Sequence, residues 1–134
     1  MFVGVDVAKA ELVVAVHPSG ARWTVTNDER GVRTLVERLR EAPPTLIVLE
    51  ATGGYELLGV AALAAAALPV VGVNPRQVRD FAKATGQLAQ TDRLDADILA
   101  RFAEKVRPAV RPIATAEAQE LDALLTRRRQ LLEM

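Results

Sequence analysis

Three strand-like segments follow one another at the start of the chain, and this order limits the possible folds more than any other feature. FVGVDVA (2–8) and ELVVAVH (11–17) are rich in valine, and ARWTVT (21–26) alternates between polar and apolar residues. Short breaks separate the segments, including the Pro/Gly turn HPSG. Consecutive strands with tight connections predict an antiparallel meander.

Helices and strands alternate in the rest of the chain. Asn27 or Asp28 can cap a helix that runs to residue 42, where two prolines stop it. TLIVLEA (45–51) and VVGV (70–73) are short apolar runs typical of buried parallel strands. Further helices are predicted at residues 55–67, 75–85 and 91–106. The predicted order is therefore β-β-β-α-β-α-β-α, an α/β chain with an antiparallel half and a parallel half.

Composition narrows the class of protein. The 134 residues suit one domain, and 50% of them are hydrophobic, which argues against disorder. The 17 basic and 17 acidic residues balance, so net charge indicates no particular partner. The absence of cysteine excludes disulfides and thiolate zinc sites. The longest apolar run, 57–73, contains Pro69 and is shorter than the roughly 20 residues of a membrane span. With no leader evident, we predict a cytoplasmic protein without membrane contact.

Two carboxylates interrupt or end apolar strands. Asp6 lies inside FVGVDVA, where an unpaired buried carboxylate would be costly, so it must be paired, metal-bound or at the exposed end of the strand. Glu50 ends TLIVLE, at the carboxyl edge where open α/β sheets place their sites. If the two strands are parallel neighbours, both side chains reach one place. A structural Asp near a turn and a solvated Glu remain the alternatives.

The stretch TDRLDADILA (91–100) sets three aspartates at the start of the last predicted helix. Because helical residues turn by about 100° each, Asp95 falls in the middle of the apolar face and Asp92 at its edge. Asp97 falls on the opposite, polar face, where we expect solvent and ion pairs. An N-cap at Thr91 or Asp92 would explain Asp92 without any chemistry, but it does not require Asp95 to face the core.

Gathered in one place, these acids would repel one another unless cations were bound. Hard oxygen ligands suit Mg²⁺ or Mn²⁺, and two such ions about 4 Å apart can stabilise the attacking and leaving oxygens of a phosphoryl transfer. The single histidine, His17, and the lack of cysteine point away from zinc. The sequence therefore predicts a carboxylate site for divalent metal.

Four motifs occur in the order of a known family. VGVDVAKAEL, VLEATGGYE, VNPRQVRDFAKATG and TDRLDADILA, over about residues 2–106, resemble the N-terminal motifs of the DEDD-type transposases and site-specific recombinases of the insertion-sequence-110 group, which includes the Piv invertase. The resemblance implies a ribonuclease H-like (RuvC-like) fold, with the first strand beside the fourth. It also implies a metal-dependent DNA transposase or recombinase whose acidic quartet is Asp6, Glu50, Asp92 and Asp95.

The same resemblance bears on domains and partners. We expect a catalytic domain at residues 1–108 and, at 115–134, an amphipathic helix that begins a coiled-coil segment and supports a homodimer or higher oligomer. In the family a C-terminal domain with a catalytic serine follows, and Ser19 in its turn is a poor candidate for that role. DNA is the implied substrate and a structured guide RNA an implied partner.

Basic residues near the acids are candidates for phosphate contacts. They are Lys9, Arg76, Arg79, Lys83 and Arg93. Solvated helix faces explain any one of them equally well. The chain departs from the family pattern at Gln87 and Gln90, where basic residues are common, which puts contacts by that loop in doubt. Tyr55 can stack on a base or pack in the core, and packing is the more frequent outcome.

Three other functions remain to be compared. A stand-alone nuclease that resolves Holliday junctions would use the same fold. An actin-like or sugar-kinase nucleotide-binding half is disfavoured, because the sequence after Asp6 is VAKAE rather than a Gly followed by Ser or Thr. A non-catalytic module that dimerises and holds nucleic acid would not need the serine domain.

Overall fold

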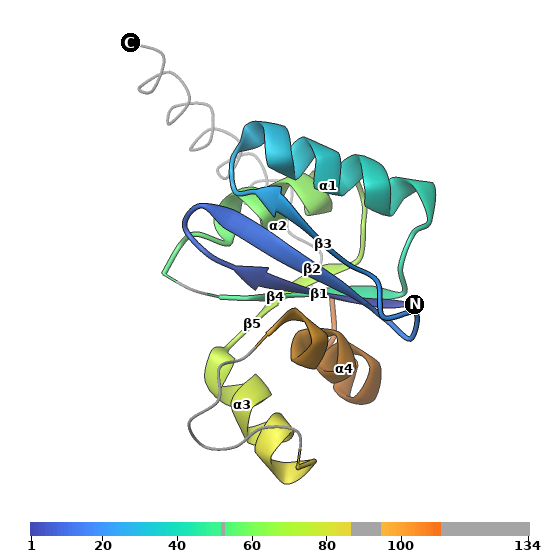
Figure 1. Cartoon of the computed structure of the whole chain (residues 1–134), viewed down its shortest axis with the longest axis vertical. Helices are drawn as coiled ribbons and strands as arrows, with labels where there is room; N and C mark the ends of the chain where they lie inside the picture. The colour runs from blue at the N-terminus through green and yellow to red at the C-terminus, as the bar shows by residue number, and fades with distance from the viewer. Residues whose placement is uncertain (52, 87–94, 111–134) are drawn as a thin grey trace.

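The structure is a computed structural model, and it describes residues 1–51, 53–86 and 95–110 (Figure 1). The first three strands form the predicted antiparallel meander, in which β1 pairs with β2 and β2 with β3. These strands are β1 (Phe2–Val7), β2 (Glu11–His17) and β3 (Arg22–Thr26).

The parallel half of the sheet adds two strands. β4 (Leu46–Glu50) runs parallel to β1, and β5 (Val70–Val73) runs parallel to β4. The five strands lie in the order β3-β2-β1-β4-β5. This order confirms the mixed sheet that the sequence pattern predicts, and it confirms the ribonuclease H-like pairing of the first strand with the fourth that the family resemblance implies.

One face of the sheet is covered by α1 (Glu29–Glu41) and α2 (Leu57–Ala65), which lie above it in Figure 1. Their buried leucines and valines pack on the inward side chains of β1, β2 and β4. Asp28 is the N-cap of α1, since its carboxylate accepts the Gly31 N–H at 2.8 Å. Of the two cap candidates in the sequence, Asp28 is therefore the one used.

The opposite face is covered by α3 (Pro75–Ala84) and α4 (Ala96–Val106), below the sheet in Figure 1. Phe2, Leu46 and Val48 pack there against Leu99 and Phe102 of α4. Gly4 lets the helix approach closely, because a Cβ at this position would collide with the backbone of Ala96 and Ala100. The helix therefore packs directly on the centre of β1.

Three contacts fix the direction of α4. Near its C-terminus, the Arg107 guanidinium lies 5.1 Å from the Phe2 ring centre, and the carboxylate of Glu104 lies 2.7 Å from His17 Nε2. Near its N-terminus, Asp97 pairs with Arg22 of β3 at 2.9 Å. Because Phe2 begins β1, α4 runs antiparallel to that strand, with its N-terminus toward the end that carries Asp6. The pairing of Asp97 confirms its assignment to the polar face.

The helix boundaries differ from the predictions at two places. The last helix was predicted from residue 91, but Asp95 is its N-cap and the helix begins at Ala96. α2 is shorter than the predicted 55–67.

The predicted segment 115–134 lies outside the described residues. Within the described ranges, no helix is long and apolar enough to cross a membrane.

Candidate metal and nucleic-acid site

Asp6 and Glu50 lie next to each other at the carboxyl edge of the sheet. The last pair of the parallel ladder is Val5 with Leu49, and each acid is the next residue along its strand. Every second residue of a strand lies on the same face, so Asp6 shares a face with Phe2 and Gly4. Glu50 likewise shares a face with Leu46 and Val48. Both carboxylates are therefore on the face that α4 covers. Neighbouring strands are about 4.8 Å apart. Both acids are half-buried.

Asp95 occupies a position that the helical prediction misjudged. Its backbone is extended, with φ −128° and ψ 175°, and its Oδ1 accepts the Ile98 N–H at 2.9 Å. Asp95 is thus a cap residue, and it does not lie inside the apolar face of a helix as predicted. A carboxylate offers about four acceptor sites, so one hydrogen bond leaves capacity for a cation.

The packing of α4 brings Asp95 toward the same edge. Ala96, the residue after Asp95, lies over Gly4, and Asp6 is two residues further along β1 on the same face. Because α4 runs antiparallel to β1, Asp95, the residue before Ala96, lies toward Asp6. Three of the four predicted site residues thus belong to one face and one end of the domain. Asp92 lies outside the described residues.

The described carboxylates do not form a complete metal site by themselves. Among residues 1–51, 53–86 and 95–110, no three His, Cys, Asp or Glu side chains are grouped closely enough to hold an ion. The chemistry of the donors fits a hard divalent cation, since Asp6, Glu50 and Asp95 offer carboxylate oxygen alone.

Asn27 joins the loops at this edge, a role that the sequence did not reveal. Its side-chain amide donates hydrogen bonds to the backbone carbonyls of Ala8, at 2.8 Å, and Tyr55, at 3.0 Å. Its own N–H donates to the carbonyl of Ala10 at 2.9 Å. Ala8 and Tyr55, the two partners of the side chain, are 19 and 28 residues from Asn27 in the sequence. No local sequence pattern could therefore have indicated these contacts.

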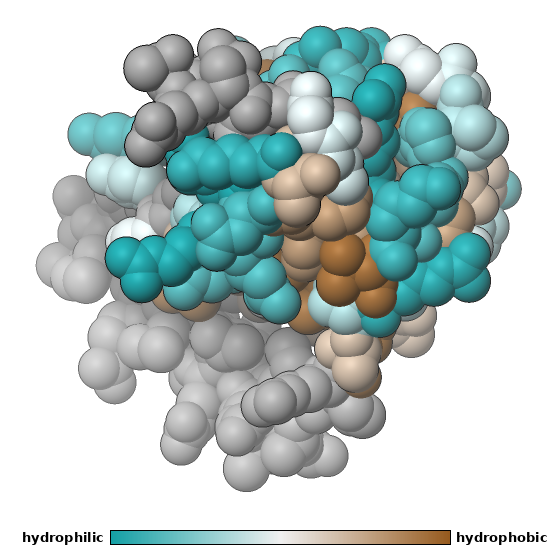
Figure 2. Space-filling view, turned by 90° about the horizontal axis from the view of Figure 1, so that it is seen from below, coloured by the Kyte–Doolittle hydropathy of each residue, from teal (hydrophilic) through white to brown (hydrophobic). Residues whose placement is uncertain are grey.

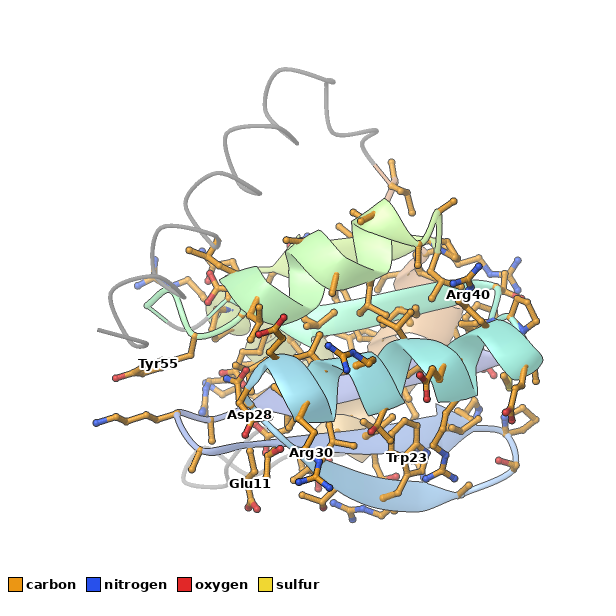
Figure 3. All side chains as sticks on the ribbon, turned by 90° about the horizontal axis from the view of Figure 1, so that it is seen from above. Glu11, Trp23, Asp28, Arg30, Arg40 and Tyr55 are labelled. Carbon is orange, nitrogen blue, oxygen red and sulfur yellow. The ribbon has the colours of Figure 1, made fainter. Side chains whose placement is uncertain are left out.

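Tyr55 does not pack in the core, which was the more frequent outcome expected for such a residue. Its side chain points away from the ribbons, at the end of the molecule that also holds Glu11 and Asp28 (Figure 3). Tyr55 is 44% exposed and the nearby Leu57 is 46% exposed. An aromatic ring with an apolar neighbour is therefore open to solvent at the edge where Asp6 and Glu50 lie.

The predicted basic residues divide into groups. Lys9 follows β1 and is exposed, as are Arg76 and Lys83 on α3, while Arg79 is half-buried. Arg93 lies outside the described residues. On a helix, positions 76, 79 and 83 fall within about 60° of one another. Since α3 begins directly after β5, this basic stripe starts at the carboxyl edge of the sheet.

The surface of the α3 and α4 layer carries both polar and apolar side chains. Seen from below, hydrophilic side chains surround a smaller apolar area (Figure 2). Farther along α4, Arg107 is already engaged, since its Nε donates to the Glu104 carbonyl at 3.1 Å. This hydrogen bond holds the Arg107 side chain against the C-terminal end of α4.

Comparison with known proteins identifies relatives. A family model for transposases of the insertion-sequence-110 DEDD type matches residues 3–134. Two relatives, from Moraxella lacunata and Moraxella bovis, are each described as "Pilin gene-inverting protein". Each is 30% identical over 143 residues, which cover 98% of this chain and 44% of the relative. The chain thus spans less than half the length of these relatives.

The family match includes both strands that carry the edge carboxylates and the helix that Asp95 caps. The matched residues also contain nearly all of the four motifs, which lie at about residues 2–106. The chain belongs to the insertion-sequence-110 family of DEDD transposases.

Proposed function

We propose that this chain is the N-terminal catalytic domain of a DNA transposase or site-specific recombinase. In this proposal Asp6, Glu50, Asp92 and Asp95 bind Mg²⁺ or Mn²⁺ for DNA strand cleavage and exchange. The main support is the adjacency of Asp6 and Glu50 on one face of neighbouring strands, with the N-terminus of α4 directed to the same edge. The family adds that its members are transposases.

The proposed residues have separable tasks. Bound divalent metal would neutralise the carboxylates and stabilise charge on the phosphate oxygens during cleavage. Asp6 and Glu50 would hold the cation from the sheet, which is rigid because β1 and β4 are central strands. Asp95 would hold the cation from the N-terminus of α4. The close packing of α4 on Gly4 fixes the distance between this helix and the sheet.

Contacts to nucleic acid would extend from this edge along α3. Arg76, Arg79 and Lys83 follow one side of the helix, and Lys9 lies beyond β1. Side chains of this kind neutralise phosphates and fix the position of a strand without reading its sequence. Tyr55 would stack on an unpaired base, an interaction worth about 1–3 kcal/mol per base. Guidance by a structured RNA and oligomerisation through residues 115–134 rest on the family resemblance.

Metal titration tests the proposal. Isothermal titration with Mn²⁺ should give saturable binding to the chain and a loss of at least about tenfold in affinity for Asp6→Asn and Glu50→Gln. Asp97→Asn, which removes the same charge from the polar face of α4, should bind like wild type. Equal affinity in all four proteins would contradict the proposed site.

A second candidate is the non-catalytic module that binds nucleic acid. It needs no metal ligands, and the exposed basic residues Arg76 and Lys83 of α3 are compatible with it. A nicking assay with Mg²⁺, with and without the C-terminal part of a longer relative added in trans, separates the two functions. Cleavage by the wild type that is lost in Asp6→Asn supports catalysis. If the wild type binds nucleic acid without cleaving it, and Asp6→Asn binds equally well, the non-catalytic module is supported. Cleavage of branched junctions by this chain alone would instead indicate the stand-alone resolvase.

A further inference from the structure

The side chain of Asn27 connects, by hydrogen bonds, the two segments that follow the proposed metal ligands Asp6 and Glu50. One amide nitrogen, Nδ2, donates to the carbonyl of Ala8 at 2.8 Å and to that of Tyr55 at 3.0 Å. Ala8 comes two residues after Asp6, and Tyr55 comes five residues after Glu50. A single side chain thus bonds to both loops.

The chemistry of the amide suits this position. Two N–H donors on one atom can bond two carbonyls at once, and the group carries no charge. A serine or threonine hydroxyl has one donor and an aspartate carboxylate has none. The backbone N–H of Asn27 also donates to Ala10, which holds the residue against the turn between β1 and β2.

Capping of α1 does not explain the residue. Asp28 performs that task, accepting from the Gly31 N–H and from the Thr26 hydroxyl, each at 2.8 Å. The amide of Asn27 bonds instead to the segments after β1 and β4, at Ala8 and Tyr55. The two adjacent residues therefore separate into one that stabilises a helix and one that connects loops.

We propose that Asn27 is a positioning residue that sets the spacing between the segments carrying Asp6 and Glu50. This inference rests on the proposed function, because the spacing matters only if both acids hold the same cation. Two neighbouring carboxylates repel each other before metal binds, and that repulsion acts to move the strand ends apart. A bond to the loop beyond each acid resists the separation, so the site is preorganised for the ion.

Hydrogen–deuterium exchange tests the structural part. In Asn27→Ala, the segments 8–10 and 53–56 should exchange faster than in wild type. Asp28→Ala is the matched control. It removes the neighbouring side chain and weakens α1, but it leaves both hydrogen bonds of the Asn27 side-chain amide in place. Faster exchange in 8–10 and 53–56 for Asp28→Ala alone, or for neither variant, would contradict the inference.

Mn²⁺ affinity, measured by titration calorimetry and by electron paramagnetic resonance of bound Mn²⁺, tests the role in the site. Removing a residue that supports metal ligands typically costs about 10–100-fold in affinity. Asn27→Ala should weaken binding about tenfold or more and broaden the spectrum of the bound ion. Asp28→Ala should bind as wild type at a temperature where both variants are folded by circular dichroism. Asn27→Gln, with the same donors on a longer side chain, should recover part of the loss.

The outcomes separate this inference from the function on which it rests. Mn²⁺ binding in wild type with equal affinity in Asn27→Ala would overturn the role of Asn27 and leave the proposed metal site intact. No Mn²⁺ binding in wild type would overturn the proposed site and this inference with it. A loss of affinity in Asn27→Ala and Asp28→Ala alike would assign the effect to general stability and also overturn the inference.

Discussion

Asp95 accepts the backbone N–H of Ile98 at 2.9 Å and so caps the N-terminus of α4. The same carboxylate is a proposed metal ligand at the carboxyl edge of the sheet. Helix capping and metal binding make different demands, since a cap needs an acceptor oxygen whereas a cation needs a negative charge. Substitutions at this position can therefore separate the two roles.

Asp95→Asn should retain folding stability and lose metal affinity. Asn is as good an N-cap as Asp, so the melting temperature should change little. Mn²⁺ affinity should fall at least about tenfold, because the charge is gone. Asp95→Ala should lose both properties, with a stability cost of about 1 kcal/mol. Calorimetry measures the melting temperature and the Mn²⁺ affinity of the same samples. Unchanged Mn²⁺ affinity in Asp95→Asn would contradict a role for Asp95 as a metal ligand and leave it only the role of a helix cap.

Gly4→Ala should destabilise the domain strongly. The added Cβ would overlap the backbone of Ala96 and Ala100 and lie 2.7 Å from Leu99 Cβ, so α4 would have to move. Overpacking of this kind costs about 1–3 kcal/mol, with more expected where backbone blocks the space. Urea denaturation measures the change. Gly72→Ala is the control, since a Cβ there meets no atom within 4 Å, and an equal loss in both would contradict the close packing of α4 on β1.

Asp28 should make stability depend on pH in the acid range. The Gly31 N–H, and then the Thr26 hydroxyl, lower the pKa of this carboxyl below its ordinary value of 3.8. The ionised cap therefore stabilises the fold fully above pH 3.8, and that contribution is lost as pH falls through the lowered native value. Asp28→Asn should remove this part of the pH dependence, as measured by denaturation between pH 2 and 6. An unchanged acid profile would contradict the role of the cap.

Tyr55→Ala should weaken binding of single-stranded DNA without lowering stability. Loss of one stacked base corresponds to about 1–3 kcal/mol, or roughly 5- to 150-fold in affinity. Tyr55→Phe keeps the ring and should bind nearly as wild type. Leu57→Ala is the matched control, because Leu57 is similarly exposed and cannot stack. Fluorescence anisotropy with a labelled oligonucleotide measures each affinity, and equal binding by Tyr55→Ala and wild type would exclude stacking.

Much of the fold could be predicted because the signals are local. Valine-rich segments and tight turns indicated β1 to β3, and apolar runs bounded by proline or glycine indicated β4 and β5. The pairing of β1 with β4 came from resemblance to a known fold, since no local pattern states which distant strands are neighbours. Asp6 and Glu50 could be singled out because carboxylates are rare in buried strands.

The start of α4 could not be predicted from periodicity. Angular positions on a helix have meaning only for residues inside it, and Asp95 has an extended backbone. Thr91, Asp92 and Asp95 are all suitable caps, so composition did not choose among them. Asn27 was considered as a cap for the same reason. Its bonds to Ala8 and Tyr55 depend on the folding of distant segments, which only the three-dimensional structure provides.

A crystal of this chain soaked in Mn²⁺, with the ions located by anomalous scattering, tests the central claim most directly. The adjacency of Asp6 and Glu50 predicts a strong peak bound by both carboxylates, at the carboxyl edge between β1 and β4. A crystal at saturating Mn²⁺ with no peak beside these two residues, or with one only at other surface acids, would contradict it.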